Sequence, residues 1–325
     1  MNEPKYTDAI KYSWSFVWHH KILWGLGILA MFIGQFGLGD FLGKIWLSGE
    51  RLVLTGEPLG QGLKIWFFGL MPYHFNDLAI LWFILLFLIV AVFVVFVAIT
   101  AQGAIVSACV SGHGIKHIPN ITKFWHSGVK HFWKVLLANV IEKIMLAMLL
   151  VDLIYVWRYI MTSGCYWPTL ALTLSLGLIL FLAILVSVLF IYTIGYIVVD
   201  DKKMIDAFKS AYQLFARHVL VSIELSIILL LFGILLVMAI IAVLAIFYFP
   251  SLFFGILAGA LNSLTLLVIG VIITTFLMVG FIVLASGIFN AFTISVWTYM
   301  FMRMHKEGLT SRILHSVEKL LKIKK

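Results

Sequence analysis

Several polar side chains lie inside long apolar stretches of the sequence, where burying a polar group is costly and often serves a function. Asn139, Glu142 and Lys143 have the i, i+3, i+4 spacing that puts side chains on one helical face. The other candidates lie in separate stretches: Gln102, Glu224 and Asn290. Glu142, Lys143 and Glu224 could form a polar cavity for a proton, an ion or a lipid headgroup. The alternative is a buried ion pair, or hydrogen bonds between helices.

Histidine is the other residue type that could support chemistry. His113 and His117 would share one face of a helix, and His126 and His131 follow them. A zinc site needs three or four converging ligands, but flanking Gly and Pro disfavour a helix here, and no Cys or carboxylate lies nearby. We therefore expect no metal and no cofactor. The sequence also lacks the nucleophile elbow, zinc-protease, P-loop and dinucleotide-binding motifs, so we expect no enzymatic activity.

Composition determines the class of protein that must position these side chains. Of the 325 residues, 63% are hydrophobic and 11% are charged. Several uncharged runs exceed the roughly 20 residues that cross about 30 Å of hydrocarbon. The alternating pattern of a membrane β-barrel is absent. We therefore predict an all-α integral membrane protein that forms one domain over residues 1–325.

The apolar runs predict six membrane spans, the fifth of which should end at Pro250 and Ser251. The approximate spans are 21–39, 77–111, 134–157, 169–199, 219–248 and 263–302. The region 251–270 is ambiguous. It could begin a separate span, or residues 251–262 could be a loop or re-entrant segment before a turn at Asn262 and Ser263. We favour the second arrangement, because it places the basic C-terminus beside the other basic segments.

This topology puts most of the positive charge on one side of the membrane. Of the 23 Lys and Arg residues, 18 lie on the side of the N-terminus. That bias is typical of cytoplasmic segments. We therefore expect a multi-pass protein of the cytoplasmic (inner) membrane with both termini in the cytoplasm.

A short half-polar helix is predicted before each odd-numbered span, over about 7–18, 121–133 and 203–217. Each contains a serine, an aromatic residue five positions later and a basic residue two positions after that: Ser13, Trp18 and His20; Ser127, Phe132 and Lys134; Ser210, Phe215 and Arg217. We expect the serine on the polar face, the aromatic side chain at the membrane interface, and the basic group near anionic headgroups. The pattern predicts three repeat units, about 1–111, 112–199 and 200–303, each an in-plane helix followed by a helical hairpin.

Glycine is frequent in the first apolar run, at Gly25, Gly27, Gly34 and Gly37. Small residues let helix backbones approach closely in membranes. The run therefore predicts a tight helix contact, although glycine is also simply common in membrane helices.

The C-terminal region 304–325 is predicted to be a basic amphipathic cytoplasmic helix. Its apolar stripe is Ile313, Leu314, Val317, Leu320 and Leu321, beside Arg312, Lys319, Lys322, Lys324 and Lys325. Such a helix suits an anionic membrane surface or an acidic partner protein. No nucleic-acid-binding module is visible, so the net charge of +9 is attributed to membrane topology.

Two segments carry a family resemblance: GYIVVDDKKMIDAFKSAYQLFARHVLV at 195–221 and NAFTISVWTYMFMRM at 290–304. Together with the opening DAIKYSWSFVWHHKILWGLGILA, they resemble uncharacterised prokaryotic polytopic membrane families. One of these is named after the membrane domain of glycerophosphoryl diester phosphodiesterases. This sequence has no catalytic barrel region, so the resemblance implies a shared membrane fold without phosphodiesterase chemistry.

These observations predict a non-enzymatic membrane scaffold or lipid-interacting protein that engages anionic lipids of the inner leaflet. The alternative is a transporter or channel for a small molecule, an ion or a lipid that uses Glu142, Lys143 and Glu224.

Overall fold

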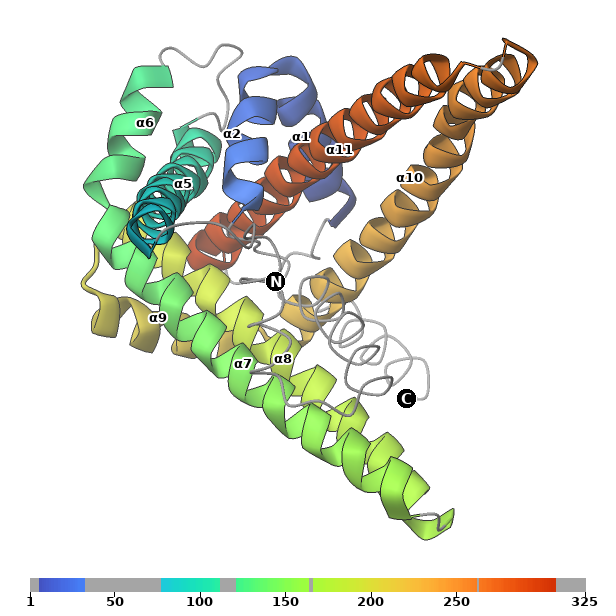
Figure 1. Cartoon of the computed structure of the whole chain (residues 1–325). Helices are drawn as coiled ribbons and strands as arrows, with labels where there is room; N and C mark the ends of the chain where they lie inside the picture. The colour runs from blue at the N-terminus through green and yellow to red at the C-terminus, as the bar shows by residue number, and fades with distance from the viewer. Residues whose placement is uncertain (1–5, 33–76, 112–120, 164–165, 262, 308–325) are drawn as a thin grey trace, which may run out of the picture.

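The computed structural model describes residues 6–32, 77–111, 121–163, 166–261 and 263–307 (Figure 1). Within these segments nearly every residue is helical and no strand occurs, so the all-α prediction is confirmed. The helices are α1 Tyr6–His19, α2 Ile22–Met31, α5 Asp77–Ser111, α6 Ile121–Lys130, α7 Phe132–Ser163, α8 Tyr166–Asp200, α9 Met204–Arg217, α10 Val219–Leu261 and α11 Leu264–Glu307.

Four helices contain segments long and apolar enough to cross a membrane: Leu85–Ser111 of α5, Leu174–Asp200 of α8, Val219–Leu261 of α10 and Leu264–His305 of α11. The described part of α2 is a shorter apolar helix, and α7 carries charged residues along its length. Six spans therefore remain a prediction.

The prediction that Pro250 and Ser251 end the fifth helix is wrong. α10 continues through Pro250 to Leu261, so residues 251–261 are helical and continuous with it. Proline removes one backbone donor, but a full break in an apolar environment would leave several backbone groups without partners. α11 begins at Leu264, after the non-helical Ser263, and residue 262 lies outside the described residues.

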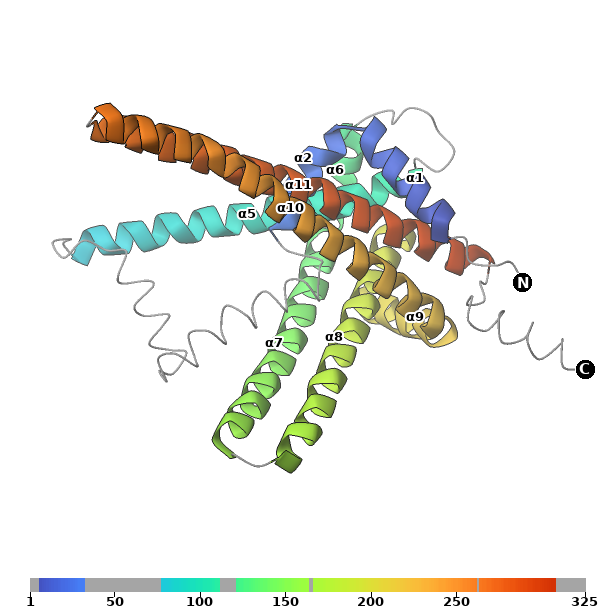
Figure 2. The same ribbon diagram turned by 90° about the vertical axis from the view of Figure 1, so that its right-hand side faces the viewer.

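Three helical arms extend from a common hub: two of them are clear in Figure 1, and Figure 2 also shows the third, formed by α5. One arm is the α7–α8 pair, one is the α10–α11 pair, and one is the first part of α5. The hub is the region where α5, α8 and α11 meet, over about residues 99–109, 188–198 and 291–304. Its largest fully buried side chains include Phe190, Tyr192, Phe292 and Phe301, whereas many large apolar side chains of the arms are exposed.

The packing around the hub is cyclic. Each short helix packs on the final long helix of the preceding predicted unit: α6 on α5, α9 on α8, and α1 on α11. The second helix of each unit follows the same rule, because α7 contacts α5, α10 contacts α8, and α2 contacts α11. Because α1 and α2 pack on α11, the first and last described helices close a ring.

Small residues make the helix crossings in this ring possible. A side-chain carbon on Gly27 would overlap the carbonyl oxygen of Gly287 and lie 2.9 Å from Ala291 Cβ. The tight contact predicted for the first apolar run is thus found at Gly27, where α2 crosses α11. Gly25 has no neighbour within 4 Å of the corresponding position. Residues 34 and 37 lie outside the described residues.

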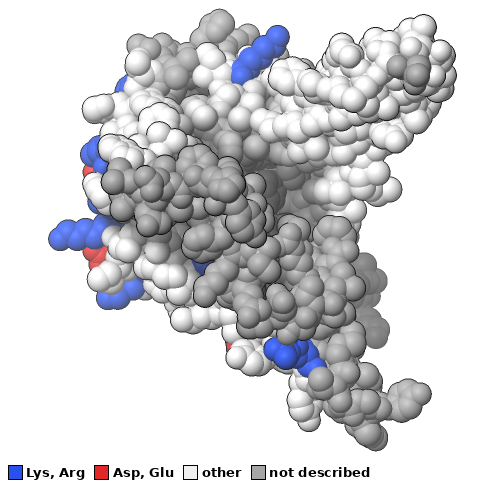
Figure 3. Space-filling view, viewed as in Figure 1, with Lys and Arg blue, Asp and Glu red and all other residues white. Residues whose placement is uncertain are grey.

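Lysine and arginine side chains gather at one edge of the molecule, over α6, the start of α7 and α9 (Figure 3). The α10–α11 arm shows no charged side chain on the face in view. Most of the visible charge thus lies on the hub side of the molecule, and further Lys or Arg atoms lie on the α7–α8 arm (Figure 3).

Candidate functional site

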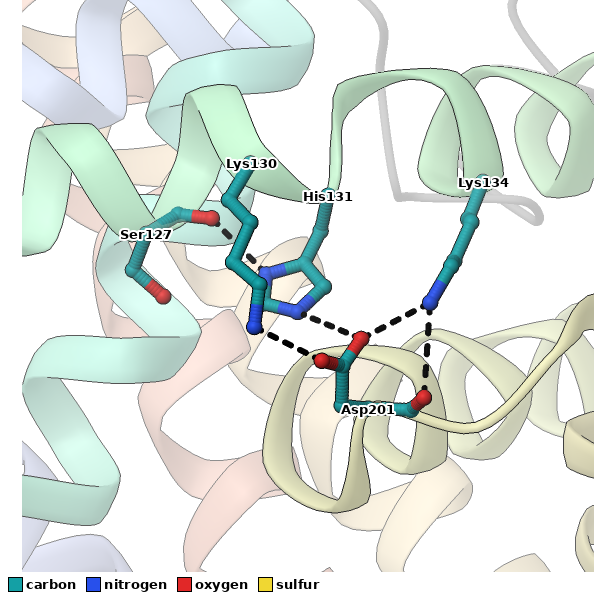
Figure 4. Close-up of polar contacts among 5 residues, drawn as sticks. All are labelled: Ser127, Lys130, His131, Lys134 and Asp201. Carbon is teal, nitrogen blue, oxygen red and sulfur yellow. Dashed lines mark hydrogen bonds and ion pairs between the residues drawn. The ribbon is translucent and has the colours of Figure 1, made fainter.

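A charged cluster joins the α6–α7 junction to the turn between α8 and α9 (Figure 4). The Asp201 carboxylate accepts hydrogen bonds from Lys130 Nζ at 2.6 Å and Lys134 Nζ at 2.7 Å. His131 Nε2 lies 3.2 Å from the same carboxylate, and His131 Nδ1 lies 2.8 Å from the Ser127 carbonyl oxygen. Both ring nitrogens therefore face oxygen atoms, one on Ser127 and one on Asp201.

Asp201 also shapes the turn itself. Its φ of 52° lies in the left-handed region, which aspartate tolerates better than most residues. The hydrogen bonds from Lys130 and Lys134, and the positive charge of these groups, hold the pKa of the Asp201 carboxyl well below its usual range. The side chain is about half exposed, so solvent screens the ion pairs.

Replacing Asp201 with asparagine should lower stability near neutral pH, because three basic groups lose their shared anion while the turn geometry remains allowed. The folded-state pKa of Asp201 is depressed, so its stabilisation is present above the unfolded value of about 4 and is lost as the pH falls below it. The melting temperatures of wild type and Asp201→Asn should therefore converge on acidification. Asp206→Asn, an exposed position on α9, is the control. A difference from wild type that is independent of pH between 3 and 7 would rule out this explanation.

A second cluster connects this turn to the end of α11. His305 Nε2 lies 3.7 Å from the Asp200 carboxylate, and His305 Nδ1 lies 3.3 Å from Tyr196 Oη. Lys202 Nζ donates to Ser210 Oγ at 3.1 Å and sits 4.3 Å from the centre of the Tyr196 ring. The turn after α8 thus contacts α7, α9 and α11.

The buried polar residues form a separate site between α5 and α7. Asn139 Nδ2 donates to Gln102 Oε1 at 3.0 Å and to the Val135 carbonyl at 2.9 Å. Glu142, one turn further along α7, is only 1% exposed. Lys143 beside it is half-buried. The structure therefore brings Gln102 and Asn139 together, with Glu142 on the same buried face.

Substituting Asn139 with leucine should destabilise the protein by about 1–2 kcal/mol, because Gln102 would lose its donor while remaining buried. The double variant Gln102→Leu/Asn139→Leu should be closer to wild type than the sum of the single variants predicts. Thermal unfolding of the four proteins in one detergent measures this coupling. Strict additivity would mean that the two amides do not interact.

The remaining polar candidates lie elsewhere. Glu224 accepts a hydrogen bond from Tyr6 Oη, which links α10 to the start of α1. Asn290 Nδ2 donates to the Gly27 carbonyl at 3.2 Å, at the α2–α11 crossing. Glu142 lies on the buried face of α7 that also carries Asn139, whereas Glu224 of α10 contacts Tyr6 of α1, and α7 and α10 are not among the helix pairs that pack closely. The structure therefore does not bring Glu142, Lys143 and Glu224 into one cavity.

The predicted interfacial anchors divide into exposed and packed residues. Trp18 is 49% exposed and stacks on the exposed Trp14, with ring centroids 5.3 Å apart, and Arg217 is exposed. Phe132 packs on Phe96, with ring centroids 4.9 Å apart. The other three anchors also contact protein groups: Phe215 is half-buried against the hub, His20 packs on Phe16, and Lys134 pairs with Asp201.

The expectation that the aligned serine lies on the polar face is wrong for Ser13, which is fully buried. The helix crossings explain this. α1 buries Ser13 against α11, and the buried small residues at the matching contacts are Gly128 of α6 and Ala211 of α9. In α6 and α9 the buried small residue directly follows the aligned serine, whereas in α1 it is the serine itself.

Sequence reasoning missed the role of Asp201, because nothing local in the sequence shows which cations a turn residue will meet. Among the described residues, no three His, Cys, Asp or Glu side chains gather as metal ligands. His113 and His117 lie outside the described residues, as does the C-terminal region 308–325. Cys109 is a buried free thiol that donates to Ser295 Oγ at 3.1 Å.

No family model, curated protein or solved structure matched the chain. The resemblance carried by residues 195–221 and 290–304 therefore stays a prediction.

Proposed function

We propose that this chain is a non-enzymatic integral protein of the inner membrane that binds anionic lipids of the cytoplasmic leaflet through its three short helices. In this proposal, three related units each contribute one short helix and two spans, and both termini lie in the cytoplasm. The hub lies near the cytoplasmic surface, and the arms cross the bilayer.

The cyclic packing of α1, α6 and α9 is the observation that carries this proposal. Each short helix occupies an equivalent place around the hub, on the final long helix of the preceding unit. Equivalent places around a ring put the three helices at the same end of the molecule, where one membrane surface can contact all of them. The repeated order of short and long helices supports three related units for the same reason.

Each short helix also exposes large apolar side chains next to basic ones. α1 exposes Trp14 and Trp18 near Lys21, and α9 exposes Ile205 and Tyr212 around Lys209. At the α6–α7 junction the exposed groups are Val129 and Trp133, with Lys123 at the start of α6. Aromatic and apolar groups enter the interface while lysines meet anionic headgroups.

Lipid selectivity tests this proposal. The protein is reconstituted with spin-labelled phosphatidylglycerol or phosphatidylcholine, and the fraction of each lipid immobilised by the protein is compared. Wild type should favour the anionic lipid several-fold, and added salt should weaken the preference. In the triple variant Lys21→Gln/Lys123→Gln/Lys209→Gln, the ratio of immobilised anionic lipid to immobilised phosphatidylcholine should fall close to one. Arg158→Gln, on the predicted outer side, should leave this ratio unchanged. Equal association of both lipids with wild type would contradict the proposal.

The geometry gives less support to transport, because Glu142 and Lys143 lie on α7 and Glu224 on α10, two helices that are not among the closely packed pairs. The pocket on the axis of the hub, lined by Val106, Ile194, Trp297 and Phe301 among others, has room for about one water molecule.

A further inference from the structure

The α10–α11 pair is too long to cross a bilayer upright. α10 has 43 residues and α11 has 44, so each helix is about 65 Å long at 1.5 Å per residue. The hydrocarbon layer of a membrane is about 30 Å thick. After Glu224, neither helix carries Asp, Glu, Lys or Arg until Arg303.

The two helices pack together from about Phe232 and Phe292 to the tip of the arm, so the excess length cannot be assigned to a separate flexible segment. Phe232 packs on Phe292 and Phe247 on Phe281, with ring centroids 6.1 and 5.6 Å apart. Nearer the tip, a side-chain carbon on Gly270 would overlap Phe254 Cβ. Pro250 lies between these contacts without ending the helix.

The outer third of this pair, residues 251–261 and 264–280, has a largely apolar surface. Phe253 is 65% exposed, Ile256 75% and Phe276 78%. If the pair stood at the usual inclination of about 20° from the membrane normal, this surface would project into water. Burying this surface in hydrocarbon instead requires a much larger angle between the helix pair and the membrane normal.

The arrangement of the arms independently favours inclination. The α10–α11 arm and the α7–α8 arm lean away from each other as they leave the hub (Figures 1 and 2). The packing around the hub is cyclic, so the arms are arranged around a central axis. If the membrane normal lies along that axis, it passes between the arms. No arm then stands parallel to the normal.

We infer that the α10–α11 pair crosses the bilayer inclined by roughly 60° from the normal, with residues 251–261 and 264–280 embedded among the acyl chains of the outer leaflet. The occupant of this exposed apolar surface is lipid hydrocarbon. The inference rests on the proposed membrane insertion and adds a lipid-binding surface in the opposite leaflet from the short helices.

Labelling at two exposed positions of α10 tests the inclination. Single cysteines are placed at Ile246 and Ile256 in a Cys165→Ser background that retains the buried Cys109. Each is tested for reaction with a membrane-impermeant maleimide. After labelling with an environment-sensitive fluorophore, each is tested for quenching by lipids that carry a nitroxide near the headgroup or deep in the acyl chain.

At an inclination of 60°, each residue of α10 advances about 0.75 Å along the membrane normal. With Leu261, the last residue of α10, at the outer boundary of the hydrocarbon, Ile256 lies about 4 Å and Ile246 about 11 Å below that boundary. Both cysteines should resist the impermeant reagent by at least tenfold relative to a cysteine at Lys209. Ile246→Cys should be quenched best by the deep nitroxide, and Ile256→Cys by the shallow one.

Rapid modification of Ile256→Cys from the aqueous phase, without quenching by lipid, would overturn the inference. Protection from both the reagent and the lipid quenchers would also overturn it, because a second protein surface would then cover the tip. Loss of membrane integration, tested by alkaline extraction, would instead count against the proposed function. Melting temperatures close to that of the background show that the labelled variants are folded.

Discussion

Replacing Gly287 with leucine should remove a large part of the stability of the protein. A side-chain carbon at this position would overlap Ile28 Cγ1 and lie 2.9 Å from both the α-carbon and the nitrogen of Ile28. The α2 backbone would have to move, and the hydrogen bond from Asn290 to Gly27 would be lost with it. Inserting bulk into a packed contact typically costs 1–3 kcal/mol, and backbone overlap places this case at about 3. The melting temperature should fall by roughly 5–10 °C.

Gly25 provides the matched control for this substitution. It lies on the same helix as Gly27, two residues away, but no atom lies within 4 Å of its missing side chain. Gly25→Ala should therefore change the melting temperature little, whereas Gly27→Ala should reproduce part of the Gly287→Leu effect. Equal effects at Gly25 and Gly27 in the same detergent would show that α2 does not cross α11 at this point.

Leucine at position 128 should detach α6 from α5 while leaving the long arms folded. A side-chain carbon on Gly128 would overlap the Thr100 carbonyl oxygen and lie 3.2 Å from the Ala104 nitrogen. Because α6 ends at Lys130, its displacement should also pull Lys130 and His131 away from Asp201. Amide exchange over α6 should accelerate by at least tenfold in Gly128→Leu, with the exchange of α8 and α11 unchanged.

Ser127→Ala tests the neighbouring position. The Ser127 contact with His131 uses the backbone carbonyl, which alanine retains, so exchange over α6 should stay close to that of wild type. Acceleration across the whole chain in Gly128→Leu would mean that α6 is required for global folding, which contradicts a local role.

The helices were predictable because each depends on local information. Long apolar runs predicted the long helices, and the mixed faces of 7–18, 121–133 and 203–217 predicted the short ones. Pro250 was misread for the same reason. A proline disfavours a helix locally, but the contacts that keep α10 continuous come from Phe281 and Gly270, on another helix.

The candidate site was only partly predictable, because polar contacts join residues far apart in the sequence. The spacing of Asn139 and Glu142 correctly placed both on a buried face of α7. The partners came from elsewhere: Gln102 for Asn139, Tyr6 for Glu224, and Asp201 for Lys134. Charge alone assigned Lys134 to lipid headgroups, since a one-dimensional pattern does not reveal a carboxylate 67 residues away.

Burial and hydrogen bonding explain why some polar residues occur inside the apolar stretches. Asn290 and Ser13 sit at helix crossings, where a small or hydrogen-bonding side chain fits the contact. Glu224 accepts a hydrogen bond from Tyr6, which ties α1 to α10. This contact gives Glu224 a structural role in closing the ring.

The central claim is that α1, α6 and α9 lie at the cytoplasmic surface of one membrane. Single cysteines at Lys11, Lys123 and Lys209, together with one at Tyr159 near the tip of the α7–α8 arm, test it in right-side-out and inverted membrane vesicles. With a membrane-impermeant maleimide, the first three should be modified only in inverted vesicles, and Tyr159→Cys only in right-side-out ones. Modification of any short-helix position in right-side-out vesicles, or of Tyr159→Cys from the cytoplasmic side, would contradict the account.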